Sequence, residues 1–278
     1  ADKIKQAYQF HAEPTRPIAG IQHNFDNNAA LIRAKALLRY GEALNARREI
    51  LRLADRMQSD LLRQRQLTYW LHKNGFHFEA IYILGKARDW NDIDVRFPTP
   101  YNRQVAAASQ RTGTDATWIY AIMRQESSMN RFAKSNAKAK GLMQLIPSTA
   151  RRMANDTGLS LSGGGIYYAD INTILGAEYL AQMFARYGNI ALASAAYNAG
   201  PGRVDRWQLR DMDDMPIWVE KIPFNETRRY VKRILEYQHV YAKHLGKKIP
   251  TVTERLNGRY QAVDAARRVP VISTESAW

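Results

Sequence analysis

One glutamate of this sequence lies on the apolar side of a predicted helix. Within residues 117–127, Ile119, Ile122, Met123 and Glu126 follow the i, i+3, i+4, i+7 spacing of a single helical face. Such a face turns toward the interior, where loss of hydration disfavours the charged form of a carboxyl and raises its pKa. A carboxyl that keeps its proton near neutral pH can act as a general acid. The alternative is a structural glutamate paired with a buried arginine, and this helix alone does not decide between the two.

Polar residues that are poor core material recur at the ends of other apolar helices in the second half of the chain. They are Gln144, Tyr197, Asn198, Glu226 and Tyr230, and residues of this kind gather where a groove is lined. Each also has a structural interpretation. The tyrosines could be half-buried rings with solvated hydroxyls, Asn198 a helix-terminating residue, Gln144 a surface polar group, and Glu226 a carboxylate at the positive end of a helix dipole.

No metal site or cofactor is predicted. The pairs His72/His77 and His239/His244 are each five residues apart, which is the wrong spacing for a metal shared on one helical face. The chain has no cysteine, so thiolate metal ligands, disulfides and a thiol nucleophile are excluded.

The elements that must position these residues are predicted to be all-α. Residues 29–90 indicate consecutive short helices in a helix-turn-helix array suited to packing and docking. Pro98 and Pro100 interrupt helix twice and mark a boundary, after which a second set of helices begins. The expected organisation is an extended lead-in (1–28), a helical linker or superhelical module (29–98), a second helical domain (99–250) and a C-terminal tail (251–278).

Charge limits the class of partner. The 278 residues are 45% hydrophobic and carry a net charge of +15, and no apolar run is long enough to predict a transmembrane segment. Residues 99–278 hold 25 Lys and Arg against 15 Asp and Glu, a net charge of +10, which favours an anionic partner. The basic residues occur singly or in pairs without a zinc-finger spacing or an RNP-like strand, so nucleic acid is not the expected partner.

Four motifs occur in an order and spacing that resemble the soluble lytic transglycosylases of glycoside hydrolase family 23. They are Gln125-Glu126-Ser127, Gly141-Leu142-Met143-Gln144-Leu145, Ala196-Tyr197-Asn198-Ala199-Gly200-Pro201-Gly202 and Glu226-Thr227-Arg228-Arg229-Tyr230-Val231. Members of that family cleave bacterial peptidoglycan with a lysozyme-like α domain. The resemblance implies that residues 99–250 form such a domain, and it extends weakly into residues 30–98, which look like the end of the superhelical domain of larger members.

The resemblance implies a role for each matching residue. Glu126 corresponds to the catalytic acid and base, Tyr197 to a tyrosine beside it, and Glu226 to a groove carboxylate near the reaction centre. The remaining substrate-binding positions are Ser135, Gln144, Ile146, Tyr179, Asn198 and Tyr230. Two features depart from the family pattern: Ile146 stands where some members have methionine, and Lys138-Ala139-Lys140 is more basic than the usual small residues.

The function that the resemblance implies is cleavage of the β-1,4 bond between N-acetylmuramic acid and N-acetylglucosamine, with a 1,6-anhydromuramoyl product and no cofactor. The expected partners are peptidoglycan glycan strands, whose stem-peptide carboxylates match the basic half, and other cell-wall enzymes are further candidates. The expected location is the periplasm, peripheral to the cell wall. The alternatives are a hydrolytic goose-type muramidase and an inactive peptidoglycan-binding scaffold protein.

Overall fold

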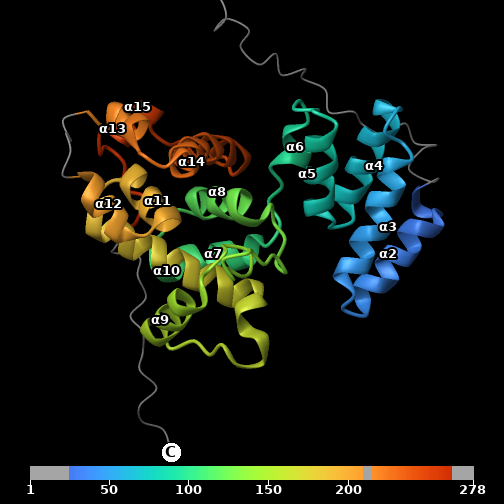
Figure 1. Ribbon diagram of the computed structural model, residues 1–278, viewed down its shortest axis with the longest axis horizontal. Helices are drawn as coiled ribbons and strands as arrows, with labels where there is room; N and C mark the ends of the chain where they lie inside the picture. The colour runs from blue at the N-terminus through green and yellow to red at the C-terminus, as the bar shows by residue number, and fades with distance from the viewer. Residues whose placement is uncertain (1–24, 209–213, 265–278) are drawn as a thin grey trace, which may run out of the picture. The chain divides into compact units, whose positions relative to one another are not determined.

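The computed structural model describes residues 25–208 and 214–264, and the chain divides into two units between Pro100 and Tyr101. Over these residues the secondary structure is helical, with three isolated β-bridges and no strand (Figure 1), which confirms the all-α prediction. No described helix is both long and apolar enough to cross a membrane.

The first unit is built from two helical hairpins followed by a short helix. Its helices are α2 (Ala29–Arg39), α3 (Ala43–Asp55), α4 (Leu61–Lys73), α5 (His77–Lys86) and α6 (Ile93–Arg96). α2 packs on α3, α4 packs on α5, and α3 also contacts α5. Their apolar stripes meet in one core that includes Ile50, Leu67 and Leu71, none of which is exposed.

The expectation of an extended lead-in is wrong for its last four residues. Phe25 is buried in the core of the first unit. Asp26 accepts a hydrogen bond of 2.7 Å from the indole nitrogen of Trp70. Asn28 caps α2, because its side-chain oxygen accepts from the backbone N–H of Ala30. These residues satisfy polar groups of the unit and bury an aromatic ring, so they are part of its fold. Residues 1–24 lie outside the described residues.

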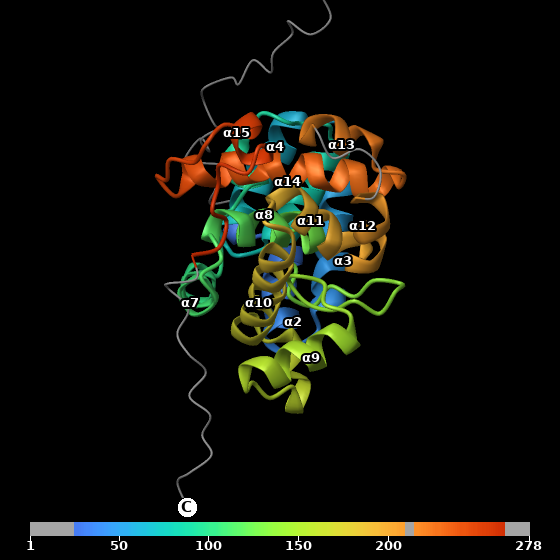
Figure 2. The same cartoon turned by 90° about the vertical axis from the view of Figure 1, so that its left-hand side faces the viewer.

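The second unit carries the motifs. Its elements are α7 (Asn102–Thr112), α8 (Ala116–Ser127), α9 (Pro147–Thr157), the 3₁₀ helix η2 (Ser162–Tyr167), α10 (Ala169–Tyr187), α11 (Ile190–Ala199), α12 (Pro201–Gln208), α13 (Met215–Lys221), α14 (Asn225–His244) and α15 (Val252–Leu256). In both views α8 and α11 lie between α14 on one side and α10 on the other, with α9 beyond α10 (Figures 1 and 2).

The centre of the second unit is apolar on all sides. α11 is rich in alanine, and residues 190–196 are all buried, as expected for a helix with no solvent-facing side. Small side chains let its neighbours approach closely, and Ser194 Oγ accepts a hydrogen bond of 3.2 Å from the indole of Trp118 on α8. α8 is therefore held at a fixed place in the unit, and the chemistry-bearing residues at its end are held with it.

Residues 251–264, expected to begin a C-terminal tail, belong to the second unit. The Asp264 N–H donates to the Gly113 carbonyl at 2.8 Å, and Val263 forms a β-bridge with Thr114. A Cβ at Gly113 would lie 2.1 Å from the Asp264 carbonyl oxygen, so this contact requires glycine. The buried guanidinium of Arg255 donates to the Leu235 carbonyl and fixes α15 against α14. The domain end expected at residue 250 is therefore too early, and residues 265–278 lie outside the described residues.

Candidate active site

Glu126 is the next-to-last residue of α8, on the helical face that the sequence predicts to be internal. Ile119, Ile122 and Met123 of that face are fully buried. Glu126 is surrounded by protein atoms but keeps partial contact with solvent. Desolvation raises the pKa of Glu126 from 4.5 to about 7. The negative end of a helix dipole at this position acts in the same direction. Near neutral pH a substantial share of the Glu126 side chains is therefore protonated, and the side chain keeps contact with solvent.

Two residues of α14 adjust this carboxyl in opposite directions. Tyr230, which is buried, donates a hydrogen bond of 2.7 Å to Glu126 Oε1 and favours the charged form, which lowers the pKa of Glu126. The charge of Glu226 disfavours a second negative charge nearby and raises that pKa. Glu226 is exposed in the first turn of α14, where a helix dipole favours an anion. Both were predicted site residues, and the structure brings both near Glu126.

Two tyrosines whose rings are tilted against each other lie next to Glu126 and beyond it. Tyr197 of α11 is close enough for the charge of Glu126 to raise its pKa, after the larger effect of burial. Its hydroxyl donates to the Met143 carbonyl at 2.7 Å. The ring of Tyr179 from α10 lies 5.2 Å from the ring of Tyr197. Tyr197 is half-buried, and its hydroxyl has a protein acceptor.

Asn198 links α11 to α14. It lies one residue before the last residue of α11, and its Oδ1 accepts a hydrogen bond of 2.7 Å from Thr227 Oγ1. Thr227 follows Glu226 directly, so this bond fixes the start of α14 and the position of the exposed carboxylate. Asn198 is therefore inside the helix and holds two motifs together.

The loop between α8 and α9 carries three predicted groove residues. Gln144 Nε2 donates to the carbonyls of Ala133 at 3.1 Å and Gly141 at 2.8 Å, which closes the loop on itself. Ser135 Oγ accepts from the Ala139 N–H at 3.0 Å and closes a smaller turn. Ile146, at the N-terminus of α9, is 49% exposed. The three residues share one loop, and two of them also hold its shape.

The sequence did not reveal how this loop is fixed to the unit. Asn172 of α10 is fully buried, and its side chain accepts from the Met143 N–H at 2.8 Å and donates to the Lys140 carbonyl at 3.1 Å. Gly141 fits against it because a Cβ there would lie 2.2 Å from Asn172 Nδ2. Gly176, one turn further along α10, leaves room for the Met143 side chain. The signal was an asparagine inside an apolar helix, a position that is unfavourable unless its amide is used.

Backbone strain is concentrated in the same region. Six described non-glycine residues have positive φ, and four of them lie within residues 128–144: Ser128, Met129, Lys138 and Gln144. Such conformations cost energy and gather at functional sites, where the surrounding structure maintains them. Ser128 and Met129 turn the chain immediately after the carboxyl-bearing end of α8.

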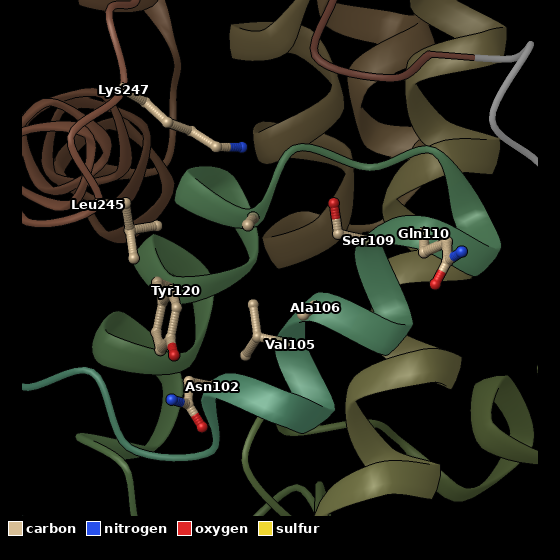
Figure 3. Close-up of a pocket in the computed structure, with 9 residues that line it drawn as sticks. Asn102, Val105, Ala106, Ser109, Gln110, Tyr120, Leu245 and Lys247 are labelled. Carbon is tan, nitrogen blue, oxygen red and sulfur yellow. The ribbon is translucent and has the colours of Figure 1, made fainter.

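A separate hollow of about 660 Å³ lies on another side of α8. Figure 3 shows it between α7, Tyr120 of α8, and Leu245 and Lys247, with the Lys247 ammonium directed toward it. Tyr120 precedes Glu126 by six residues, which places it about 120° away around the helix. The hollow is therefore distinct from the carboxyl site. Among the described residues, no group of three or more His, Asp or Glu side chains is placed to hold a metal ion.

Comparisons with known proteins find similarity to lytic transglycosylases. Residues 103–216 match the Transglycosylase SLT domain, and residues 221–249 match the Soluble lytic transglycosylase helical domain. The second match covers α14, not residues 29–98, where the sequence placed the superhelical module. Soluble lytic murein transglycosylases from Escherichia coli K12 and Salmonella typhimurium LT2 are 35% and 37% identical over 195 and 171 residues, which are 68% and 60% of this chain.

A solved structure of a lytic transglycosylase is similar to this chain. An inactive Glu-to-Gln mutant of the lytic transglycosylase Slt from Pseudomonas aeruginosa superposes with a TM-score of 0.75 and 35% identity over 92% of this chain and 40% of that one. The matches cover 30% and 26% of the E. coli and Salmonella proteins, so the chain spans under a third of these curated relatives. With its SLT domain on the unit that holds Glu126, the chain belongs to the soluble lytic transglycosylase family.

Proposed function

We propose that this chain is a peptidoglycan lytic transglycosylase that cleaves the β-1,4 bond between N-acetylmuramic acid and N-acetylglucosamine and leaves a 1,6-anhydromuramoyl end. The observation that carries the proposal is Glu126, a partly exposed carboxyl whose pKa desolvation raises to about 7. At that pKa both the protonated and the ionised form are populated near neutral pH, as a group that alternates between acid and base requires.

Bond cleavage begins with Glu126 as the acid. Its proton passes to the glycosidic oxygen, the bond from that oxygen to C1 of the muramoyl residue breaks, and the N-acetylglucosamine departs as an alcohol. The positive charge that develops at C1 is met by the carbonyl oxygen of the 2-acetamido group, which the substrate itself supplies. Acid–base catalysis of this kind contributes roughly 100- to 10,000-fold to the rate.

Ring closure then uses the same residue as the base. Ionised Glu126 removes the proton from the 6-hydroxyl of the muramoyl residue, and that oxygen forms the bond to C1. The proton count balances, because Glu126 ends as it began and no water is consumed. The Tyr230 hydroxyl donates to Glu126 Oε1 and stabilises the carboxylate between the two steps. Holding the 6-hydroxyl where water would otherwise attack is a positioning effect, which can supply several kcal/mol.

We assign the other predicted residues to substrate binding. Tyr197 lies half-buried near Glu126, Tyr179 supports the ring of Tyr197, and Ile146 offers an exposed apolar side chain. The Gln144 amide nitrogen is occupied by backbone carbonyls, so its side-chain oxygen is the group we assign to the substrate. The exposed carboxylate of Glu226 is the second acidic group of the site.

Digestion of purified sacculi by the wild type and by Glu126→Gln tests the proposal. We expect anhydromuramoyl products from the wild type and a rate at least 100-fold lower from the variant. The P. aeruginosa relative was solved as an inactive Glu-to-Gln mutant, which supports this expectation. A goose-type muramidase would release products heavier by one water, and mass spectrometry separates the two. A wild type without lytic activity that still binds sacculi would favour the scaffold alternative.

We infer that the chain acts in the periplasm, at the cell wall, because its substrate is there and its relatives carry the name murein transglycosylase. Fractionation of cells that produce the natural protein tests this location. Recovery with the periplasmic contents is the expected result, and recovery with the cytoplasmic contents would contradict it.

A further inference from the structure

The stretch from Ser127 to Asn155 contains basic residues and no acidic ones. Its 29 residues contain six cationic side chains and no aspartate or glutamate. The chain as a whole has 26 acidic residues in 278, so two or three would be expected in a stretch of this length. The six cations, which together we call the basic rim, are Arg131, Lys134, Lys138, Lys140, Arg151 and Arg152.

The basic rim has no carboxylate partner within the described part of the chain. None of its side chains forms an ion pair there, and five of the six are exposed, with Lys140 half-buried. Three of them rest on aromatic rings: Arg131 on Phe132 at 4.3 Å, Lys140 on Tyr167 at 5.7 Å and Arg152 on Tyr179 at 5.5 Å. Like charges on one short segment repel each other. Cations held in place by rings lose less entropy when they bind an anion.

The basic rim adjoins the candidate active site. Lys140 forms β-bridges with Lys134 and with Leu145, so the backbone of two rim residues lies beside Gln144. Lys138 is in the turn that Ser135 closes. Arg152 lies over Tyr179, whose ring contacts Tyr197. The rim therefore follows the loop and the helix that carry predicted substrate-binding residues.

We propose that the basic rim binds the carboxylates of peptidoglycan stem peptides, so that stem charge determines which strands are cleaved. This inference rests on the proposed function and names the part of the substrate that the rim contacts. Only the muramoyl residues of a glycan strand carry stems, so an anchor for stem carboxylates also selects which sugar is placed at Glu126. The negative charge of Glu226 at the reaction centre repels the same carboxylates, which directs the stem toward the rim.

Binding of a defined probe to the Glu126→Gln chain tests the inference without requiring turnover. The probe is a tetrasaccharide of two disaccharide units with stem peptides whose carboxylates are free, compared with the same molecule with those carboxylates converted to amides. One exposed ion pair changes an equilibrium constant by roughly 1.4- to 5-fold. We therefore expect about 10-fold tighter binding of the free-carboxylate probe at about 0.05 M salt and a ratio near one at about 0.5 M.

Two triple substitutions in the Glu126→Gln chain locate the effect. Lys134→Gln, Lys138→Gln and Lys140→Gln should reduce the ratio to about twofold. The matched control, Lys243→Gln, Lys248→Gln and Arg259→Gln, removes three exposed positive charges elsewhere in the same unit. Lys243 lies 13 residues beyond Tyr230 on α14, about 20 Å away at a rise of about 1.5 Å per residue. The control should leave the ratio unchanged.

Equal affinity of the Glu126→Gln chain for the two probes would overturn the inference. A control triple that lowers the ratio as much as the loop triple would do the same. Neither result bears on the proposed function, because that function is tested by cleavage of sacculi with the wild-type chain. A wild type that fails to cleave would defeat the proposed function, and the binding ratio would still decide whether the rim recognises stem carboxylates.

Discussion

Replacing Glu126 with glutamine should stabilise the second unit by an amount that grows with pH. Glutamine keeps nearly the same size and cannot ionise. In the wild type, folding raises the pKa of Glu126 from 4.5 to about 7. Below about pH 4.5 the carboxyl is protonated in both the folded and the unfolded chain, and it contributes no pH dependence. Between pH 4.5 and 7 the unfolded chain releases this proton while the folded chain retains it. The free energy of unfolding of the wild type therefore decreases as the pH rises from 4.5 to about 7. That of the Glu126→Gln variant does not decrease for this reason.

The magnitude follows from the pKa values. Each pH unit by which the folded pKa exceeds the unfolded one is worth about 1.4 kcal/mol, so a rise from 4.5 to about 7 corresponds to about 3 kcal/mol. Glu126 keeps some contact with solvent, which reduces this value. We therefore expect the variant to gain about 2 to 3 kcal/mol of stability over the wild type between pH 4.5 and about 7. Loss of the charge-assisted bond from Tyr230 adds an offset, so the slope with pH is the quantity to compare.

Native-state hydrogen exchange is the suitable assay, because two units need not unfold together. The free energy of opening is measured for amides of α8 and α14 in both full-length chains, from about pH 4.5 to 8. Glu236→Gln, an exposed position on α14, is the matched control and should show no such slope. A difference between wild type and Glu126→Gln that stays constant over this range would mean that the carboxyl is fully hydrated, and the argument for a protonated acid would fail.

Three further substitutions test the surroundings of Glu126. Tyr230→Phe removes the donor to Glu126 Oε1 and should raise the pKa of Glu126. The alkaline limb of the pH–rate profile should then move to higher pH, with a lower maximal rate. An unmoved limb would contradict this role of Tyr230. Glu226→Gln removes a charge that raises the same pKa, so titration of kcat/KM should give a limb at lower pH, the opposite direction. Gly176→Ala places a Cβ 2.3 Å from Met143 Sδ and should cost about 1–3 kcal/mol in urea unfolding and lower kcat, whereas wild-type stability would show that Met143 moves freely.

The all-α fold and the position of Glu126 could be predicted because both depend on local periodicity. The apolar stripe of α8 includes residues separated by three and four positions, so the sequence alone places Ile119, Ile122 and Met123 inside and Glu126 in line with them. The all-α class follows from the same kind of pattern. The roles assigned to the groove residues came from the family resemblance, and they stay predictions.

The parts that could not be predicted are long-range polar contacts. Asn172 binds the Met143 backbone 29 residues away, and Asn189 Nδ2 donates at 2.6 Å to the carbonyl of Leu256, 67 residues away. Neither partner is a side chain, so the partner's sequence carries no signal of the contact. The same reason explains why residues 251–264 were taken for a tail: the backbone of Asp264 and Val263 makes the contacts with Gly113 and Thr114.

A single carboxyl that both gives and recovers a proton cannot have an extreme pKa. Burial alone would keep the proton on Glu126 and make it a poor base, whereas a fully ionised carboxylate would be unable to start the reaction. The structure sets opposing influences on this one side chain: desolvation and the Glu226 charge favour the neutral form, and the Tyr230 hydroxyl favours the charged form. Tyr230 and Glu226 both belong to the first turns of α14, and Asn198 fixes that end of the helix through Thr227. The position of α14 relative to α8 therefore sets the balance between acid and base.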